Sequence, residues 1–217
     1  KPIGMNRAEA EAIKAAAGTL LVGEAFMIRH HPQWHAVGEI IASGRIGPLR
    51  AVQTFFSFLN VDPANIRNRP ETGGGAMLDI GCYAVASARM IFKSEPTRVF
   101  ALIDRDPAMK TDRTDTILAD FGDGRQFSAM LSTQSFRHQH VSIIGTLGRI
   151  EMPTPFSAPT ETETMFGIDV KGPGELLETI TVAPVDQYAL QAEAFSRAVA
   201  GTGPWHYGAD DAIANMA

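Results

Sequence analysis

An acid and a phenol lie four residues apart in the segment Gly73-Gly74-Gly75-Ala76-Met77-Leu78-Asp79-Ile80-Gly81-Cys82-Tyr83. The apolar residues that follow the glycines recur at helical spacing, and residues i and i+4 of a helix lie one above the other. Asp79 and Tyr83 are therefore expected on one face, where a carboxylate beside a phenol could transfer a proton. The glycines would let a flat ligand approach the backbone closely. The alternative is a structural one, in which a glycine-rich loop caps a buried helix and Asp79 complements its dipole.

Basic residues at two further places could contact a ligand. Arg29, His30 and His31 follow an apolar run that predicts a strand, and α/β proteins place ligand-binding residues at the carboxyl ends of strands. These three residues would form either one wall of a binding site or a solvated polar hinge between two domains. Arg67, in a polar loop, would either contact a substrate hydroxyl or lie on the surface.

The histidines invite a metal-binding hypothesis that their spacing does not support. No spacing among His35, His138, His140 and His206 matches a zinc-ligand pattern. His138 and His140 lie two apart on an expected strand, so they would simply share one sheet face. The sequence therefore predicts no metal site.

The elements that would position these residues follow from hydrophobic periodicity and from breaker residues. Helices are expected at 6–17, 32–43, 78–92 and 187–200, and strands at 20–28, 48–61, 99–103, 114–121, 125–136, 140–145, 148–152, 163–170 and 176–182. Gly122-Asp123-Gly124 predicts a tight hairpin turn. Neighbouring strands joined by short turns favour antiparallel pairing. The sequence thus predicts an α+β fold: an open, mostly antiparallel sheet with helices on one face, preceded by a helix–strand unit.

Two apolar surfaces of this fold must be covered, one by the chain's own core and one by a second copy of the chain. Along the last helix, apolar residues recur at helical spacing and are expected to pack into the core; they are Tyr188, Ala192, Phe195 and Val199. The sheet face without helices must also be covered. We expect a second copy of the chain to cover it, giving a homodimer or a higher homo-oligomer.

Composition excludes several classes of partner. The 217 residues are 45% hydrophobic, enough for one core or for one core and part of another. A net charge of −5 argues against nucleic acid or an anionic membrane as the main partner. No stretch is expected to supply the roughly 20 apolar residues of a membrane span. The single Cys82 excludes an internal disulfide, suits a reducing cytoplasm, and is expected to be a buried, inert thiol.

Several segments, in their order along the chain, resemble one family of nicotinamide-dependent oxidoreductases. Residues 71–83 together with Lys1-Pro2 are similar to the Gfo/Idh/MocA family, named for glucose–fructose oxidoreductase and inositol dehydrogenase. Three further stretches, at 24–33, 65–67 and 186–195, resemble the dihydrodiol dehydrogenase and NADP-dependent xylose dehydrogenase branch.

This resemblance implies an enzyme that moves hydride between a sugar, polyol or dihydrodiol hydroxyl and NADP or NAD. It implies that Lys1, Asp79 and Tyr83 are catalytic. Because a phenol has an ordinary pKa near 10, we expect the lysine to favour the phenolate or to hold the substrate oxygen. By the same resemblance the cofactor would contact Lys1, Pro2 and Arg29, and the small-molecule substrate would contact His31 and Arg67.

The resemblance also implies a dinucleotide-binding domain that this sequence does not contain. No G-x-G-x-x-G phosphate loop opens the chain, although family members carry one after their first strand. We therefore expect residues 1–28 to be a remnant of that Rossmann domain and residues 29–217 to be the substrate-binding and oligomerisation domain. A competing hypothesis is a non-catalytic substrate-binding and dimerisation fragment with no activity of its own.

Overall fold

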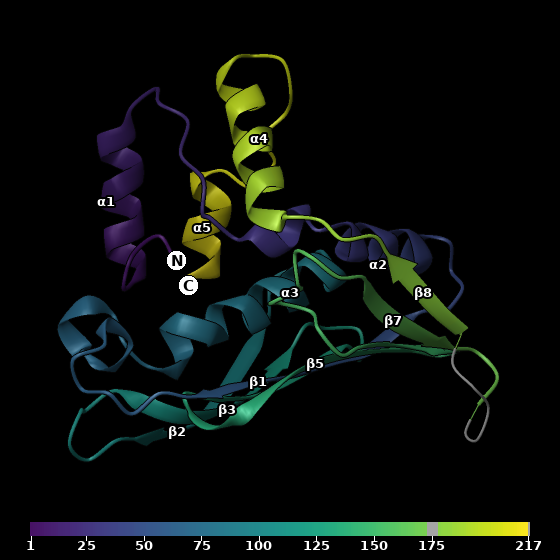
Figure 1. Ribbon diagram of the computed structural model, residues 1–217, viewed down its shortest axis with the longest axis horizontal. Coiled ribbons are helices and arrows are strands. Elements are labelled where there is room, and N and C mark those ends of the chain that lie inside the picture. The colour runs from purple at the N-terminus through teal and green to yellow at the C-terminus, as the bar shows by residue number, and fades with distance from the viewer. Residues whose placement is uncertain (173–177, 217) are drawn as a thin grey trace.

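The computed structural model describes residues 1–172 and 178–216, which build an eight-stranded sheet with helices on one face (Figure 1). The strand order is β2-β3-β4-β1-β5-β6-β7-β8. The strands are β1 (Leu49–Leu59), β2 (Arg98–Arg105), β3 (Asp112–Asp120), β4 (Gln126–Ser132), β5 (Gln134–Gly145), β6 (Arg149–Met152), β7 (Thr164–Asp169) and β8 (Glu178–Val182). Neighbours pair antiparallel except β1 and β4, which are parallel. The predicted α+β fold is confirmed.

The core lies between the sheet and the helices above it. Alternate residues of the central strands point inward and are almost fully buried, among them Val52, Ile117, Phe127, Leu131, Val141 and Ile143. Each such side chain contributes roughly 1.5–3 kcal/mol when fully buried. The central strands therefore form a rigid floor for the segments that cross them.

The helical segment that carries Asp79 and Tyr83 lies directly on this floor. It begins as a π-helix, Met77–Gly81, and continues as α3, Cys82–Phe92. A Cβ on Gly81 would lie 2.8 Å from a methyl carbon of Leu131 in β4, so glycine permits the close approach of helix to sheet. The single α-helix predicted at 78–92 is thus correct in extent, but its first turn is wider than expected.

The same segment corrects the expectation about membrane spans. With the 3₁₀ turn that precedes it, the helical run Pro70–Phe92 has 23 residues and is apolar enough to cross a membrane by length and composition. Burial within the protein accounts for that apolar character, because 67% of its most apolar window is buried. We interpret it as the core helix of the domain.

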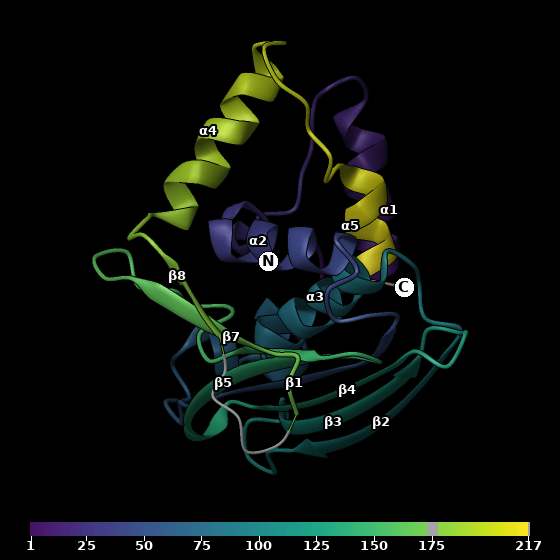
Figure 2. The same cartoon turned by 90° about the vertical axis from the view of Figure 1, so that its right-hand side faces the viewer.

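The other helices form a second layer and an upper lobe. Helix α2 (Pro32–Ala42) covers the β7–β8 end of the same sheet face, while α1 (Arg7–Ala17), α4 (Gln187–Val199) and α5 (Ala209–Asn215) stand above it (Figures 1 and 2). Helices α1 and α5 pack together, and Lys14 Nζ lies 2.5 Å from Asp210 Oδ1. The proposed domain boundary after residue 28 stays a prediction.

Two predictions are wrong: the strand at 20–28 and the burial of the apolar stripe on the helix at 187–200. Residues 20–28 do not form a strand: they make a single bridge, between Gly23 and Gly208, and enter the 3₁₀ turn Met27–His30. A strand needs a neighbouring ladder, and the described residues offer none at this place. Helix α4 does not bury its apolar stripe, because Tyr188 is 60% exposed and Val199 is 65% exposed.

The remaining strand and turn predictions agree closely with the structure. Residues 125–136 contain the end of one strand and the start of the next, since β4 ends at Ser132 and β5 begins at Gln134. The hairpin turn between β3 and β4 is confirmed, with φ of 76° at Gly122 and 72° at Gly124. Residues 176 and 177 of the last predicted strand lie outside the described residues, and β8 spans the remainder.

The sheet face opposite the helices carries exposed apolar side chains. No helix of the described chain crosses this face in either view (Figures 1 and 2). Cross-strand register puts Phe100 opposite Leu118 and Met130 opposite Phe55, and the first three are 66%, 51% and 42% exposed. The face is therefore apolar over β2, β3 and β4.

Candidate active site

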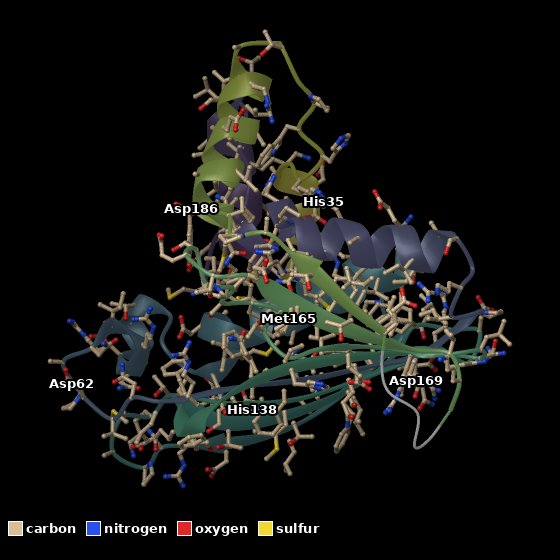
Figure 3. All side chains as sticks on the ribbon, turned by 45° about the vertical axis from the view of Figure 1, so that its right-hand side comes forward. His35, Asp62, His138, Met165, Asp169 and Asp186 are labelled. Carbon is tan, nitrogen blue, oxygen red and sulfur yellow. The ribbon has the colours of Figure 1, made fainter. Side chains whose placement is uncertain are left out.

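A cavity of about 430 Å³ opens where β1 ends and β5 begins, beneath the start of the helix that carries Asp79. Its walls come from the chain's first residue, the loop after β1, the π-helix, β5 and the first turn of α4. In Figure 3, His138, Asp62 and Asp186 mark β5, that loop and the start of α4. The lining includes Lys1, Met27, Phe56, Asn60, Arg67, Asp79, Tyr83, Arg137, His138, Gln139, Phe156 and Tyr188.

Asp79 is the meeting point of two cations in this cavity. Its Oδ1 atom accepts a hydrogen bond from Lys1 Nζ at 3.1 Å, and its Oδ2 atom accepts one from Arg67 Nε at 3.0 Å. The Asp79 side chain is only 12% exposed, whereas Lys1 is 24% and Arg67 44% exposed, so the carboxylate is more buried than the two cations that it binds. The structure therefore brings Lys1 and Arg67, which lie 78 and 12 residues from Asp79 in sequence, to the same carboxylate.

Tyr83 lies beneath the lysine in an aromatic pocket. Lys1 Nζ is 5.1 Å from the centroid of the Tyr83 ring, and the Tyr83 hydroxyl donates a hydrogen bond to Met27 Sδ at 3.3 Å. Phe26 packs edge-on against the ring at a centroid distance of 5.0 Å, and Phe156 is tilted against it at 5.9 Å. The residue is 5% exposed.

Burial sets the protonation state of this phenol. Desolvation, reinforced by Cys82, Tyr188 and Asp79, raises the pKa of Tyr83 above its ordinary value, and Arg67 opposes this only weakly. We expected the lysine to favour the phenolate, but the desolvation is the larger effect. The tyrosine is therefore a neutral hydroxyl at physiological pH.

Glu24 fixes the backbone next to Lys1. It is 3% exposed, and its Oε1 atom accepts a hydrogen bond from the Ile3 N–H at 3.1 Å. Burial is the main reason that the pKa of Glu24 is raised, and the bond from Ile3 partly offsets it. The bonded residue, Ile3, lies two residues after Lys1. By fixing this backbone, Glu24 helps to position the lysine over Tyr83.

The glycine run is used for internal packing. A Cβ on Gly74 would lie 2.6 Å from the Arg67 carbonyl oxygen, and one on Gly75 would lie 2.1 Å from Asp112 Oδ1. Gly75 also has a φ of 119°. Asp112 Oδ2 accepts the Met77 N–H at 2.6 Å, so its carboxylate occupies the start of the helix. The space that we expected a flat ligand to use is filled by Arg67 and Asp112.

Two residues assigned to ligands by resemblance do not line this cavity. Arg29, expected at the cofactor, is 3% exposed; its Nη1 atom lies 2.5 Å from Asp211 Oδ2, and its guanidinium lies 4.3 Å from the Tyr207 ring centroid. His31, expected at the substrate, is 1% exposed and caps α2, with Nδ1 accepting the Gln33 N–H at 3.1 Å. Both side chains therefore hold structural elements in place.

Several lining residues could not be recognised from the sequence. Phe56 and Phe156 stack with their ring centroids 4.7 Å apart, although 100 residues separate them. Gln139 Oε1 accepts the backbone N–H groups of Phe156 and Ser157 at 3.1 and 3.0 Å, which fixes that loop over the cavity. Only strand register, which aligns Phe56 with Gln139, would have indicated this contact.

The remaining candidates are the histidines and Cys82. Among residues 1–172 and 178–216, no group of three or more His, Cys, Asp or Glu side chains is arranged to bind a metal ion. His138 and His140 stack with ring centroids 6.4 Å apart on one sheet face. Cys82 is buried as predicted, and burial raises its pKa to about 12, so the thiol is unreactive.

Comparison with known proteins identifies the family. Residues 34–151 match the family described as GFO/IDH/MocA C-terminal domain. The chain belongs to the Gfo/Idh/MocA family. It is 43% identical over 185 residues to an uncharacterized oxidoreductase, ORF334, of Rhizobium meliloti, and 35% identical over 188 residues to D-xylose 1-dehydrogenase (NADP(+)) 2 of Haloferax volcanii.

Both alignments cover 84% of this chain and 55% of the relative, so the chain spans about half the length of these relatives. KijD10, a 3-ketoreductase from Actinomadura kijaniata solved with NADP and TDP-benzene, has the same fold. Its TM-score is 0.91 at 24% identity, with 100% of this chain and 66% of KijD10 covered.

The family predicted from the sequence is confirmed, and so is the branch. Trans-1,2-dihydrobenzene-1,2-diol dehydrogenases are relatives of this chain, as is the D-xylose dehydrogenase. The family assignment connects the cavity of Lys1, Asp79 and Tyr83 with proteins that are oxidoreductases.

Proposed function

We propose that the full-length protein containing this chain is an NADP-dependent oxidoreductase that moves hydride between a sugar, polyol or dihydrodiol hydroxyl carbon and the nicotinamide. The observation that carries the proposal is the convergence of Lys1, Asp79 and Tyr83 on one cavity. The named activities of the D-xylose and dihydrodiol dehydrogenase relatives support it. NADP is favoured over NAD because the xylose dehydrogenase uses NADP(+).

The residues present fit a nicotinamide site. Lys1 is 24% exposed along its side chain and lines this cavity, where it would border the cofactor. Pro2 lines a separate pocket with Met5 and Met77, so its contact with the cofactor stays a prediction. The bound nicotinamide would supply or accept the hydride. The protein would manage the proton and the position of the reacting oxygen.

In the reducing direction, the buried Tyr83 hydroxyl is the proton donor. Thioether sulfur is a weak hydrogen-bond acceptor, so a carbonyl oxygen of the substrate competes well with Met27 Sδ for that hydroxyl. Lys1 donates a second hydrogen bond to the same oxygen and stabilises the charge that develops there. Asp79, bound to both Lys1 and Arg67, keeps the ammonium group in place. In the oxidising direction Tyr83 must first lose its proton, which burial opposes.

The shape of the cavity suits a sugar ring. The stacked Phe56 and Phe156 give an apolar surface for the C–H groups of a ring, whereas Asn60, Gln139 and Arg67 supply polar groups at the rim. Pockets of this kind orient a ligand through a few convergent polar groups over an apolar wall. The substrate class proposed here is therefore a hydroxylated ring.

The exposed sheet face supports a homodimer. Phe100, Leu118 and Met130 form a contiguous apolar patch over β2–β4, which is the kind of surface that isologous dimers bury. Replacing Leu118 with glutamate should convert the dimer to monomer in analytical ultracentrifugation. A Leu147→Glu control, in the exposed β5–β6 turn, should leave the dimer intact. The interface would be rejected if the Leu118→Glu variant remained dimeric like the control, or if the wild-type protein were a monomer.

A substrate screen tests the proposed activity. Full-length protein is incubated with NADP and, separately, with D-xylose and trans-1,2-dihydrobenzene-1,2-diol, and nicotinamide absorbance is followed. We expect turnover with at least one of them and a lower kcat/KM with NAD. Absence of nicotinamide turnover with every sugar, polyol and dihydrodiol tested would reject the proposal.

A further inference from the structure

The cavity has more positive charge than the proposed reaction uses. Among the described residues that line it, Lys1, Arg67 and Arg137 are cationic, and Asp79 is the one carboxylate. Asp79 is already shared between Lys1 and Arg67. The full sequence carries a net charge of −5, so this local excess runs against the overall balance of the chain.

Arg137 is the cation without a carboxylate. It lies on β5, two residues before Gln139, so both side chains leave the strand on the same face. Many arginines of the chain lie within salt-bridge distance of an acid, for example Arg149 with Asp169 at 3.2 Å and Arg98 with Asp120 at 2.7 Å. Within the described residues the Arg137 side chain makes neither a salt bridge nor a hydrogen bond, yet it lines the cavity.

Resting on the proposed function, we infer that the substrate is an anionic sugar derivative whose carboxylate or phosphate binds Arg137. The planar guanidinium can donate two parallel hydrogen bonds to either group. Asp79 cannot repel this anion strongly because Lys1 and Arg67 neutralise it. Arg137 thus selects the substrate, while the reacting hydroxyl lies at Lys1 and Tyr83.

The expected size of the effect follows from charge-assisted hydrogen bonding. A hydrogen bond to a charged group at a partly exposed site corresponds to about a tenfold to hundredfold preference in binding. D-glucuronate and D-glucose are a suitable pair of probes, since they differ only in a carboxylate at C6. D-glucose 6-phosphate separates a phosphate-specific site from a carboxylate-specific one.

The experiment measures binding and turnover of these probes with full-length protein. Isothermal titration calorimetry gives Kd for each sugar, and nicotinamide absorbance gives kcat/KM. The test variant is Arg137→Gln, and Arg137→Lys keeps the charge without the planar fork. Arg50→Gln is the matched control, because Arg50 is exposed on β1 outside this cavity and, among the described residues, hydrogen-bonds to the Asp123 carbonyl oxygen alone.

We expect an anionic sugar to bind at least tenfold more tightly than D-glucose. Arg137→Gln should remove this preference, and Arg50→Gln should retain it. The inference is overturned if Arg137→Gln leaves the preference unchanged, or if the variant raises the KM for NADP instead. Turnover of neutral sugars alone would overturn the inference and leave the proposed function intact. Selective binding of the anion without any turnover would support the anion site and reject the hydride transfer.

Discussion

The hydroxyl group of Tyr83 donates a hydrogen bond to the sulfur atom of Met27, 3.3 Å away, inside an aromatic pocket. This bond links α3 to the 3₁₀ turn that precedes α2, two segments separated by 56 residues. Both residues line the cavity, and the bond orients the phenol, which burial keeps neutral. Its weak acceptor leaves it ready to exchange partners when a substrate oxygen arrives.

Replacing Met27 with leucine tests that exchange. The two side chains have similar volume, so the substitution should change the free energy of unfolding by less than about 1.5 kcal/mol. The Tyr83 hydroxyl then lacks a partner in the free enzyme and gains more when substrate binds. We expect KM for the substrate to fall severalfold with kcat within about twofold of wild type, as measured by steady-state kinetics. A rise in KM would show that Met27 supports the bound substrate.

Glu24 should act on catalysis through Lys1. In Glu24→Ala, the Ile3 N–H loses its acceptor, and the lysine is no longer fixed over Tyr83. We expect kcat to fall about tenfold or more, because small displacements of a positioned group are costly. Glu24→Gln keeps an acceptor oxygen and should restore most of the activity. If both variants lost activity equally, with the same melting temperature, the carboxylate charge rather than the hydrogen bond would be the important property.

Asp115 should make the protein less stable as the pH rises. It is 1% exposed on the inward face of β3, and burial, together with the adjacent Asp112, raises its pKa from 3.8 to about 8. Below pH 4 the carboxyl is neutral in both the folded and the unfolded chain, so it does not lower the free energy of unfolding. Above pH 4 only the unfolded chain ionises freely, so the folded state loses stability progressively until about pH 8.

Asp115→Asn should remove this loss. Relative to wild type, the variant should gain on the order of a few kcal/mol between pH 4 and pH 8, measured by urea unfolding at each pH. The difference between the two proteins isolates Asp115, because Glu24 and the buried histidines are common to both. Asp123→Asn, at an exposed turn, is the control and should show no such trend. A constant difference across the pH range would contradict a raised pKa.

The sequence predicts much of the fold but only part of the site. Periodicity located β1, α2 and the core helix to within a few residues, since burial against a sheet imposes those patterns. It could not detect the π-helical turn at Met77–Gly81, because wide and ordinary helical turns bury similar residues. Residues 20–28 read as a strand from their composition, whereas a strand requires neighbours that local sequence does not reveal.

Within the site, spacing indicated Asp79 and Tyr83, a polar loop indicated Arg67, and resemblance added Lys1; the fold brings all four to one cavity. Arg29 and His31 do not line this cavity, and their assignment to cofactor and substrate stays a prediction, because buried structural basic residues look the same in sequence as ligand-binding ones. Arg29 is neutralised by Asp211, which lies 182 residues further on. Phe156 and Gln139 were missed because their contribution depends on strand register.

The most direct test of the catalytic assignment is the turnover of Tyr83→Phe in the full-length protein. The substitution removes one buried oxygen atom and keeps the aromatic packing with Phe26 and Phe156. If Tyr83 carries the proton, kcat should fall about 10²–10⁴-fold while the Kd for NADP, measured by fluorescence titration, stays within twofold. A variant that folds, binds NADP and turns over at nearly the wild-type rate would show that Tyr83 does not carry the proton.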